Sequence, residues 1–289
     1  MAASSQRISS AANPLLKEVR RAVRQGGLTQ DGCVVAESFH LLEEALRSGR
    51  ECEVVLAIES ARPKVEEIAA AARRHVAIRI VANSLLATAA ATETTQGVIA
   101  LVRPPAWTLN DLFGRNPLVV VLDGVQDPGN AGAMVRAAEA FGATGVLFLP
   151  ETASPFHPKT LRASAGSLFR LPCVSGVDRD AAREELRRRK LQILAASAES
   201  GEPPDAVYWT VPSALVIGSE AHGVSDALRQ DAKAVRIATR GVESLNASIA
   251  AAVLLYEASR QRGGLDGRDT DMTPGGHTAE RDAAGRALA

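Results

Sequence analysis

The amino-acid sequence predicts an α/β protein of two domains, a smaller mixed domain of residues 1–106 and a parallel-sheet domain of residues 107–262. Its 289 residues are long for one domain and comfortable for two. Apolar runs of strand length alternate with helical patterns through both parts. Between them, "RPPAWTLNDLFGRNP" contains three prolines and no clear periodicity, which indicates a connection between domains.

The first domain is expected to hold helices over 13–25, 38–49 and 63–75, and strands over 33–37, 53–58, 77–82 and 96–102. Asn13 and Ser38 are placed to cap the first two helices, and Pro14 suits a first turn. Gly49 is typical of a helix end.

In the second domain the alternation restarts and tightens. Strands are expected over 118–123, 145–150, 191–197, 214–219 and 234–239, with helices from Ala131, near Lys159, across 181–190, after Ser225 and from Leu245. Several strands are continuously apolar, as in parallel sheets covered by helices on both faces. Residues 263–289 are rich in glycine and charge without periodicity, so we expect a disordered tail.

Composition narrows the class of protein. The formal net charge is zero. The sequence has three cysteines, an odd number, and none of them forms a C-x-x-C pair; they are Cys33, Cys52 and Cys173. This cysteine pattern argues against a disulfide framework and a metal site and favours a reducing compartment. No apolar run approaches the roughly 18 residues of a membrane span, and the start lacks an apolar signal core. We therefore expect a cytoplasmic protein with no membrane contact.

The stretch "LDGVQDPGNAGAMVRAAEAFGATGVLFLP" resembles the start of a dinucleotide-binding domain. The glycine pattern fails that test, because Gly124, Gly129 and Gly132 do not form G-x-G-x-x-G, and no Gly-Lys-Ser/Thr follows. What remains is Asn130 at the helix entry and Arg136 further along the helix. Taken alone they would be a capping residue and a surface arginine.

Two later segments carry polar residues in comparable places. "ALVIGSEAHGVS" runs a strand into a loop with Glu220 between Gly218 and Gly223. "AVRIATRGVESLNASIAAAVLLYEASRQR" places Ser244 and Asn246 before a helix that is apolar on most faces, which indicates burial. Each segment alone also fits ordinary capping.

Together, in this order, the three segments resemble the SpoU (TrmH-like) family of RNA ribose 2′-O-methyltransferases in the SPOUT superfamily. The resemblance covers 117–262, and the first hundred residues resemble the family's substrate-binding domain. It implies a deep trefoil knot, a homodimer with the active site completed across its interface, and S-adenosylmethionine bound in the knot with no metal.

The resemblance also carries residue roles. The positions that match the family's catalytic residues are Asn130, Arg136, Glu220, Ser244 and Asn246. The positions that match its donor-binding backbone are Gly218, Ile237 and Leu245, with the strand end at Ala195, Ala196 and Ser197. One departure is that Ala238 and Thr239 stand where the family often has Pro-Met.

RNA contact is expected from Lys17, Arg20, Arg21 and Arg24 and from "KTLRASAGSLFR". Ribosomal RNA is the first candidate substrate and transfer RNA the second, and a role in antibiotic resistance stays open. The alternatives are a superfamily enzyme that methylates a base and an RNA-binding factor without catalysis.

Arg136 is either the general base or a clamp on the target phosphate. His157 and His222 are assigned neither metal nor base.

Overall fold

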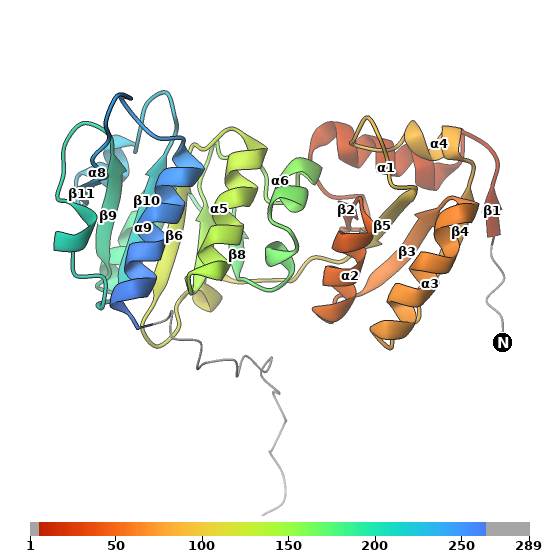
Figure 1. Cartoon of the computed structure of the whole chain (residues 1–289), viewed down its shortest axis with the longest axis horizontal. Coiled ribbons are helices and arrows are strands. Elements are labelled where there is room, and N and C mark those ends of the chain that lie inside the picture. Colours follow the sequence, from red (N-terminus) through yellow and green to blue (C-terminus); the bar gives the residue numbers. More distant parts are fainter. Residues whose placement is uncertain (1–5, 264–289) are drawn as a thin grey trace, which may run out of the picture.

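The computed structural model describes residues 6–263, which form two sheets, one in each predicted domain (Figure 1). The predicted two-domain α/β architecture is confirmed. The tail for which we expected disorder lies, apart from Gly263, outside the described residues. Among the described helices none is long and apolar enough to cross a membrane.

The first sheet is mixed and has five strands in the order β1-β4-β3-β5-β2. Its strands are β1 (Gln6–Ile8), β2 (Val34–Ala36), β3 (Cys52–Ala57), β4 (Ile78–Val81) and β5 (Val98–Val102). The strands β1, β4 and β3 run parallel, whereas β5 is antiparallel to both β3 and β2. Strand β1 was not predicted, because three residues are too few to show a period.

Helices cover both faces of this sheet. They are α1 (Pro14–Gln25), α2 (Phe39–Arg47), α3 (Arg62–Ala71) and α4 (Asn83–Ala87), with the short 3₁₀ turn η1 (Glu59–Ala61) before α3. The apolar sides of α1 and α4 pack on one face, and those of α2 and α3 on the other. The predicted caps are confirmed, since the side chains of Asn13 and Ser38 accept hydrogen bonds from the amides of Leu15 and Leu41. Helix α4 was not predicted.

The second sheet has six parallel strands in the order β11-β9-β10-β6-β7-β8. They are β6 (Leu118–Asp123), β7 (Gly145–Phe148), β8 (Cys173–Ser175), β9 (Gln192–Ser197), β10 (Ser213–Gly218) and β11 (Lys233–Arg236). The central β6 and β10 are buried along their whole length, as their unbroken apolar sequences predict. The three-residue β8 was missed for the same reason as β1.

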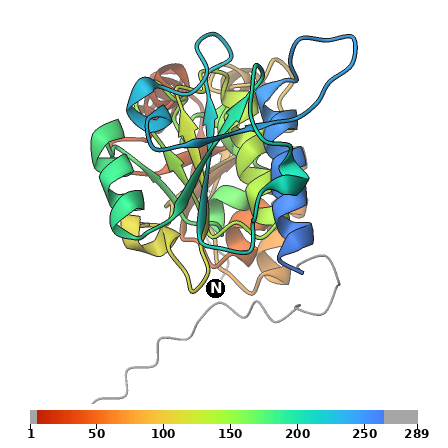
Figure 2. The same ribbon diagram turned by 90° about the vertical axis from the view of Figure 1, so that its left-hand side faces the viewer.

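Helices also enclose this second sheet (Figure 2). They are α5 (Pro128–Ala140), α6 (Pro158–Ala163) and α9 (Ala247–Gln261) on one side and α7 (Arg179–Arg188) and α8 (Asp226–Arg229) on the other, with 3₁₀ turns η2 (Leu109–Leu112), η3 (Ser167–Phe169) and η4 (Pro204–Ala206). Helix α5 begins three residues before the expected Ala131, and α9 begins two residues after the expected Leu245. Both shifts follow from which side chain caps the helix.

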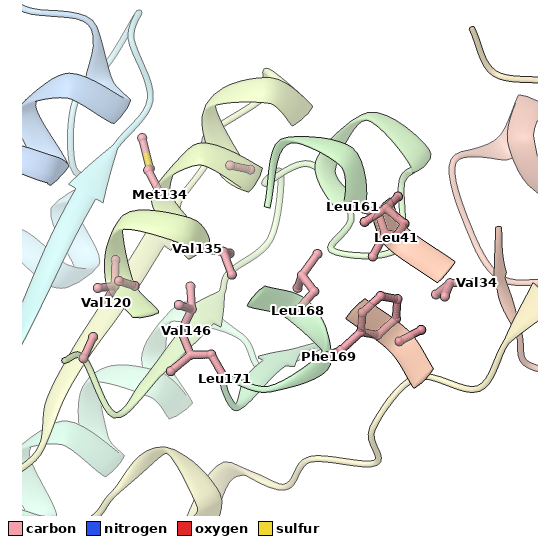
Figure 3. Packing of buried hydrophobic residues seen from close by; sticks show 14 of the residues in the cluster. Val34, Leu41, Val120, Met134, Val135, Val146, Leu161, Leu168, Phe169 and Leu171 are labelled. Carbon is pink, nitrogen blue, oxygen red and sulfur yellow. The ribbon is translucent and has the colours of Figure 1, made fainter. Parts of the chain in front are cut away.

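The two domains share one hydrophobic cluster. Leu161 of α6 and Phe169 of η3 lie against Leu41 of α2 and Val34 of β2 (Figure 3). An ion pair between Arg170 and Glu44 spans the same boundary. Segment 158–170 thus joins the domains, and Figure 1 shows α6 between α5 and the first sheet.

Candidate active site

The carboxyl edge of the second sheet is where the predicted site residues gather. Strands β6, β10 and β9 end at Asp123, Gly218 and Ser197, and the register places Gly218 beside Asp123 and Arg236 beside Ser197. Loops that follow parallel strands at this edge are the usual place for ligands in open α/β sheets.

Three of the predicted catalytic residues form one hydrogen-bonded cluster at this edge. The Nδ2 of Asn130 donates to Oε1 of Glu220 over 2.6 Å, and the Nδ2 of Asn246 donates to Oδ1 of Asn130 over 3.2 Å. Asn130 lies 90 positions from Glu220 and 116 from Asn246. The fold therefore brings together one polar side chain from each of the three sequence segments. The side-chain amide of Asn130 is fixed because both its nitrogen and its oxygen are hydrogen-bonded.

Asn130 is free for this contact because it does not cap α5. The capping residue is Asp127, whose Oδ1 accepts from the amide of Asn130 over 2.8 Å. Lys159 of α6 donates to Oδ2 of Asp127 over 2.7 Å, and this bond holds the pKa of Asp127 below its ordinary value. The interpretation of Asn130 as a helix cap is thus wrong, and its side chain points to Glu220 instead.

Asn246 has two roles at the start of α9. Its Oδ1 accepts from the amides of Ser248 over 2.9 Å and Ile249 over 3.3 Å, while its Nδ2 reaches Asn130. The helix therefore begins at Ala247 and its capping residue belongs to the cluster. Ser244 is exposed and makes no side-chain hydrogen bond with any other residue between 6 and 263, so this chain does not bring it into the cluster.

Arg136 also stays outside the cluster. It is exposed on α5, six positions after Asn130, and its guanidinium forms no hydrogen bond or ion pair with the residues that the structure describes. Six positions along a helix correspond to about 9 Å of rise and a side-chain direction roughly 120° away. Within one chain, Arg136 and Asn130 therefore face different directions.

The loop of residues 219–225 folds back on the strand before it. The amide of Ser219 donates to the carbonyl of Gly223 over 3.1 Å, and the amide of Gly223 donates to the carbonyl of Ser219 over 2.9 Å. A Cβ at Gly218 would lie 2.0 Å from the carbonyl carbon of Gly223, so only glycine fits at 218. Ser225 occupies the N-cap position of α8, but its side chain makes no capping hydrogen bond.

The positions expected to bind the donor through the backbone lie at neighbouring strand ends. Ala195, Ala196 and Ser197 close β9, Gly218 closes β10, and Ile237 directly follows β11. Leu245 stands immediately before Asn246 of the cluster. The side of Gly218 that a side chain would occupy is filled by Gly223, so peptide groups alone are left to contact a ligand there. This arrangement fits recognition by backbone atoms.

The two segments expected to contact RNA differ in what their charges do. Lys17, Arg20, Arg21 and Arg24 line one open hollow along α1. In segment 159–170 Lys159 is paired with Asp127 and Arg170 with Glu139 over 2.6 Å. In the α1 group Arg21 is paired with Glu18, but Lys17 and Arg24 are exposed and form no ion pair with the described residues, so the hollow on α1 is the better phosphate-binding surface of the two.

The two histidines named in the sequence analysis have different surroundings. His157 caps α6, with Nδ1 accepting from the amide of Lys159 over 3.0 Å, and burial lowers the pKa of its imidazole. His222 is exposed in the loop after β10. Within residues 6–263 no group of three or more His, Cys, Asp or Glu side chains could hold a metal ion.

Sequence reasoning missed three residues that shape this edge. Asp127 carries a usable signal, because an acid followed by proline before an Ala-rich run is a typical helix start. Asp123 and Arg179 form an ion pair of 2.7 Å across 56 positions, and nothing local in the sequence predicts it.

Comparison with known proteins identifies relatives of both domains. Residues 117–256 match the SpoU rRNA methylase family, and residues 38–108 match an RNA 2′-O ribose methyltransferase substrate-binding domain. The chain is 30% identical over 259 residues to the 23S rRNA (guanosine(2553)-2′-O)-methyltransferase RlmP of Bacillus subtilis, covering 87% of this chain and 98% of that protein. It is 34% identical over 221 residues to the 23S rRNA (guanosine-2′-O-)-methyltransferase RlmB of Xylella fastidiosa, covering 73% and 89%.

Solved structures show the same likeness. An RNA 2′-O ribose methyltransferase superposes with a TM-score of 0.75 at 30% identity, over 89% of this chain and 99% of that one. The SpoU methyltransferase AviRb of Streptomyces viridochromogenes in complex with AdoMet superposes with a TM-score of 0.77 at 26% identity, over 86% and 98%. The chain therefore belongs to the SpoU rRNA methylase family and is an RNA 2′-O-ribose methyltransferase.

Proposed function

We propose that this enzyme methylates a ribose 2′-hydroxyl of ribosomal RNA with S-adenosylmethionine as the donor. The observation that carries the proposal is the Asn130–Glu220–Asn246 cluster at the carboxyl edge of the second sheet. Ribosomal RNA is the preferred substrate because the two named relatives act on 23S rRNA, and transfer RNA is the second candidate. Residues 1–106 would bind the RNA and residues 107–262 would transfer the methyl group.

The cluster is suited to hold a ribose in place. Its Asn130 side chain is oriented by Glu220 and Asn246 and lies at the sheet edge beside the proposed donor positions. Bound S-adenosylmethionine supplies a methyl group on an already activated sulfonium. The task left to the chain is to align the hydroxyl and to let its proton leave, so orientation is the main contribution of this cluster.

Arg136 acts in this proposal as a clamp on the phosphate next to the target ribose. A guanidinium has a pKa above about 12, so accepting a proton would require a strongly perturbed environment. Arg136 is exposed, which supports a role as an unpaired cation that receives a phosphate. The proton of the 2′-hydroxyl would then pass to water.

The donor is proposed to lie against the ends of β9, β10 and β11. The backbone of Ser197, Gly218 and Ile237 would hold it, with Leu245 closing the pocket from the start of α9. Ala238 and Thr239, which stand where the family often has Pro-Met, directly follow Ile237 at this proposed pocket. A deep trefoil knot, expected from the family, would form where the chain returns from β11 at the sheet edge to α9 beside α5.

A homodimer is the proposed working form. Helix α9 was expected to be buried on most faces, yet Ile249, Val253 and Tyr256 are 54%, 39% and 49% exposed. Their spacing places them on one face of α9, and a second copy of the chain would cover them. The same contact could supply the partner's Arg136 to this cluster, which the chain's own Arg136 does not join.

We further propose a cytoplasmic location, because Cys33, Cys52 and Cys173 are all free thiols and suit a reducing compartment. RNA would approach along α1, where Lys17 and Arg24 are exposed and available to phosphates. Sequence-specific readers of RNA usually engage loops, so we expect a target nucleotide in an unpaired segment.

The direct test maps 2′-O-methylated nucleotides in total RNA from cells with and without the gene. One ribosomal position should lose its methyl group and regain it when the gene, but not its Arg136→Ala form, is restored. Loss at a transfer RNA position would replace the substrate, and digestion of the labelled product to a methylated base would refute ribose methylation.

A further inference from the structure

An ion pair between the buried Asp123 and the partly exposed Arg179 contacts the end of the loop 219–225 and has no part in the proposed chemistry. Asp123, the last residue of β6, is 2% exposed. Its Oδ1 accepts from Nε of Arg179 over 2.7 Å, and this bond raises the pKa of the guanidinium. Burying a carboxylate costs free energy unless both of its oxygens have hydrogen-bond partners, so Oδ2 of Asp123 also needs one.

The second oxygen of Asp123 holds the loop of residues 219–225. Oδ2 accepts from the amide of Ser225 over 2.7 Å, across 102 positions of sequence. Arg179 is fixed in turn, because its Nη2 donates to the carbonyl of Pro150 over 3.0 Å and to Glu151 over 3.3 Å. One carboxylate therefore ties β6, the start of α7 and the end of this loop together.

The loop transmits that constraint to Glu220. The paired hydrogen bonds between Ser219 and Gly223 close it into a compact turn, and its first residue continues directly from β10. The carboxyl-terminal end of the turn is Ser225, where Asp123 holds it. Without this hydrogen bond the far end of the turn would keep the buried side chain of Val224 and its continuation into α8 but lose its link to β6, and the contact between Glu220 and Asn130 would become less fixed.

We propose that Asp123 and Arg179 are positioning residues that fix the turn 219–225 so that Glu220 meets Asn130. Neither residue touches a substrate in this proposal, and its catalytic consequence rests on the proposed function. The pair acts through Glu220, which distinguishes it from an ion pair that only stabilises the fold.

The first experiment measures hydrogen exchange in the full-length protein. Asp123→Asn leaves one acceptor for two donors, so amides of 219–225 should exchange faster by about tenfold or more, the effect of one lost charge-assisted hydrogen bond. The matched control is Glu185→Gln. Like Asp123, Glu185 is a carboxylate paired with arginine, and it lies on α7, 2.7 Å from Arg188 and 2.5 Å from Arg189. Unchanged exchange in 219–225 of the Asp123→Asn protein overturns the proposal.

The second experiment separates positioning from stability by single-turnover methylation. Asp123→Asn should slow methyl transfer by up to about 100-fold, as expected for a misplaced catalytic group, with the RNA KM almost unchanged. In a Glu220→Ala background the same change should have little further effect, because the positioned group is gone. An equal loss in both backgrounds would show a general effect on the fold and overturn the proposal.

Arg179→Gln provides the same test from the other side of the pair, should Asp123→Asn fold poorly, since the Arg179 side chain is partly exposed. The hydrogen-exchange result needs no RNA. If the turn loosens but the wild-type enzyme methylates no ribose, the proposed function fails and only the structural part of this proposal survives.

Discussion

The loops that follow β6 and β10 leave the same sheet edge side by side, but different contacts hold them in place. The first is short and enters α5 at once, capped by Asp127 and fixed by Lys159. The second folds back over its own strand and is held at its far end by Asp123. Glycines lie in or next to both loops, yet neither segment has the pattern of a phosphate-binding loop.

The glycines next to the two loops allow different segments of backbone to approach. Gly132 lets α6 approach α5, because a Cβ there would lie 2.3 Å from the carbonyl oxygen of Thr160. Gly218 instead makes room for the returning backbone of Gly223. A glycine-rich sequence at the end of a parallel strand therefore indicates close backbone approach, and only the structure identifies the neighbour that approaches.

The largest effect should come from the acceptor side of the site. Arg136→Ala is expected to lower turnover on RNA by at least about 100-fold, as for loss of a charged group that stabilises the transition state. Donor affinity, measured by calorimetry, should stay nearly unchanged, because the proposed donor positions lie at the ends of β9, β10 and β11. Near-normal turnover would remove Arg136 from the site.

The next effect should separate the donor side from the acceptor side. In Gly218→Ala the new methyl group meets the backbone of Gly223, an overpacking that costs about 1–3 kcal/mol. If this strain falls on the bound state, donor affinity should drop by about 10- to 100-fold. Gly27→Ala is the control, since nothing lies within 4 Å of its added Cβ. Equal donor affinities of the two variants would place the donor elsewhere.

Two glycines in the first turns of α5, Gly129 and Gly132, should behave differently. Gly132→Ala pushes the Cβ into the carbonyl oxygen of Thr160 and to 2.7 Å from the Cβ of Ala163, and should lower stability by about 1–3 kcal/mol. Gly129→Ala places the Cβ 2.7 Å from Oδ1 of Asp127 and 3.1 Å from Cε of Lys159, side-chain ends that can shift by weakening the cap and its ion pair, while alanine favours a helix. The Tm of Gly129→Ala should therefore fall less than the Tm of Gly132→Ala.

Local signals predicted much of this molecule, and longer-range contacts account for what they missed. The unbroken apolar run of β6 and the caps Asn13 and Ser38 depend on neighbours in sequence, and all three were predicted. The three-residue strands β1 and β8 are held by pairing with distant strands and carry no period of their own. The exposed face of α9 was missed because an all-round apolar helix does not tell which partner covers each side.

The site shows the same division. Asn130, Glu220 and Asn246 came from resemblance to a family, and the structure brings them into contact. The same resemblance named Arg136 and Ser244, and neither joins the cluster within one chain. The resemblance therefore named some residues that one chain brings together and others that it keeps apart, and the proposed dimer would bring Arg136 to the cluster.

The smallest predicted effect concerns Asp127, the residue that caps α5 at the end of the first loop. Asp127→Ala removes the side chain that accepts from the amide of Asn130, and should lower the free energy of unfolding at pH 7 by about 1 kcal/mol. Asp127→Asn keeps a capping oxygen and loses the ion pair with Lys159, which is exposed to solvent and worth less.

The pH dependence of these two variants distinguishes cap from charge. Since the pKa of Asp127 is lowered in the folded protein, chiefly by Lys159, its ionic contribution is present above the ordinary value of 3.8 and is lost as the pH falls through the lowered pKa. The stability gap between the wild type and Asp127→Asn should therefore close in acid, as followed by urea unfolding between pH 7 and pH 3. A gap independent of pH would mean that Lys159 contributes nothing through charge, and that the first loop is fixed by its cap alone.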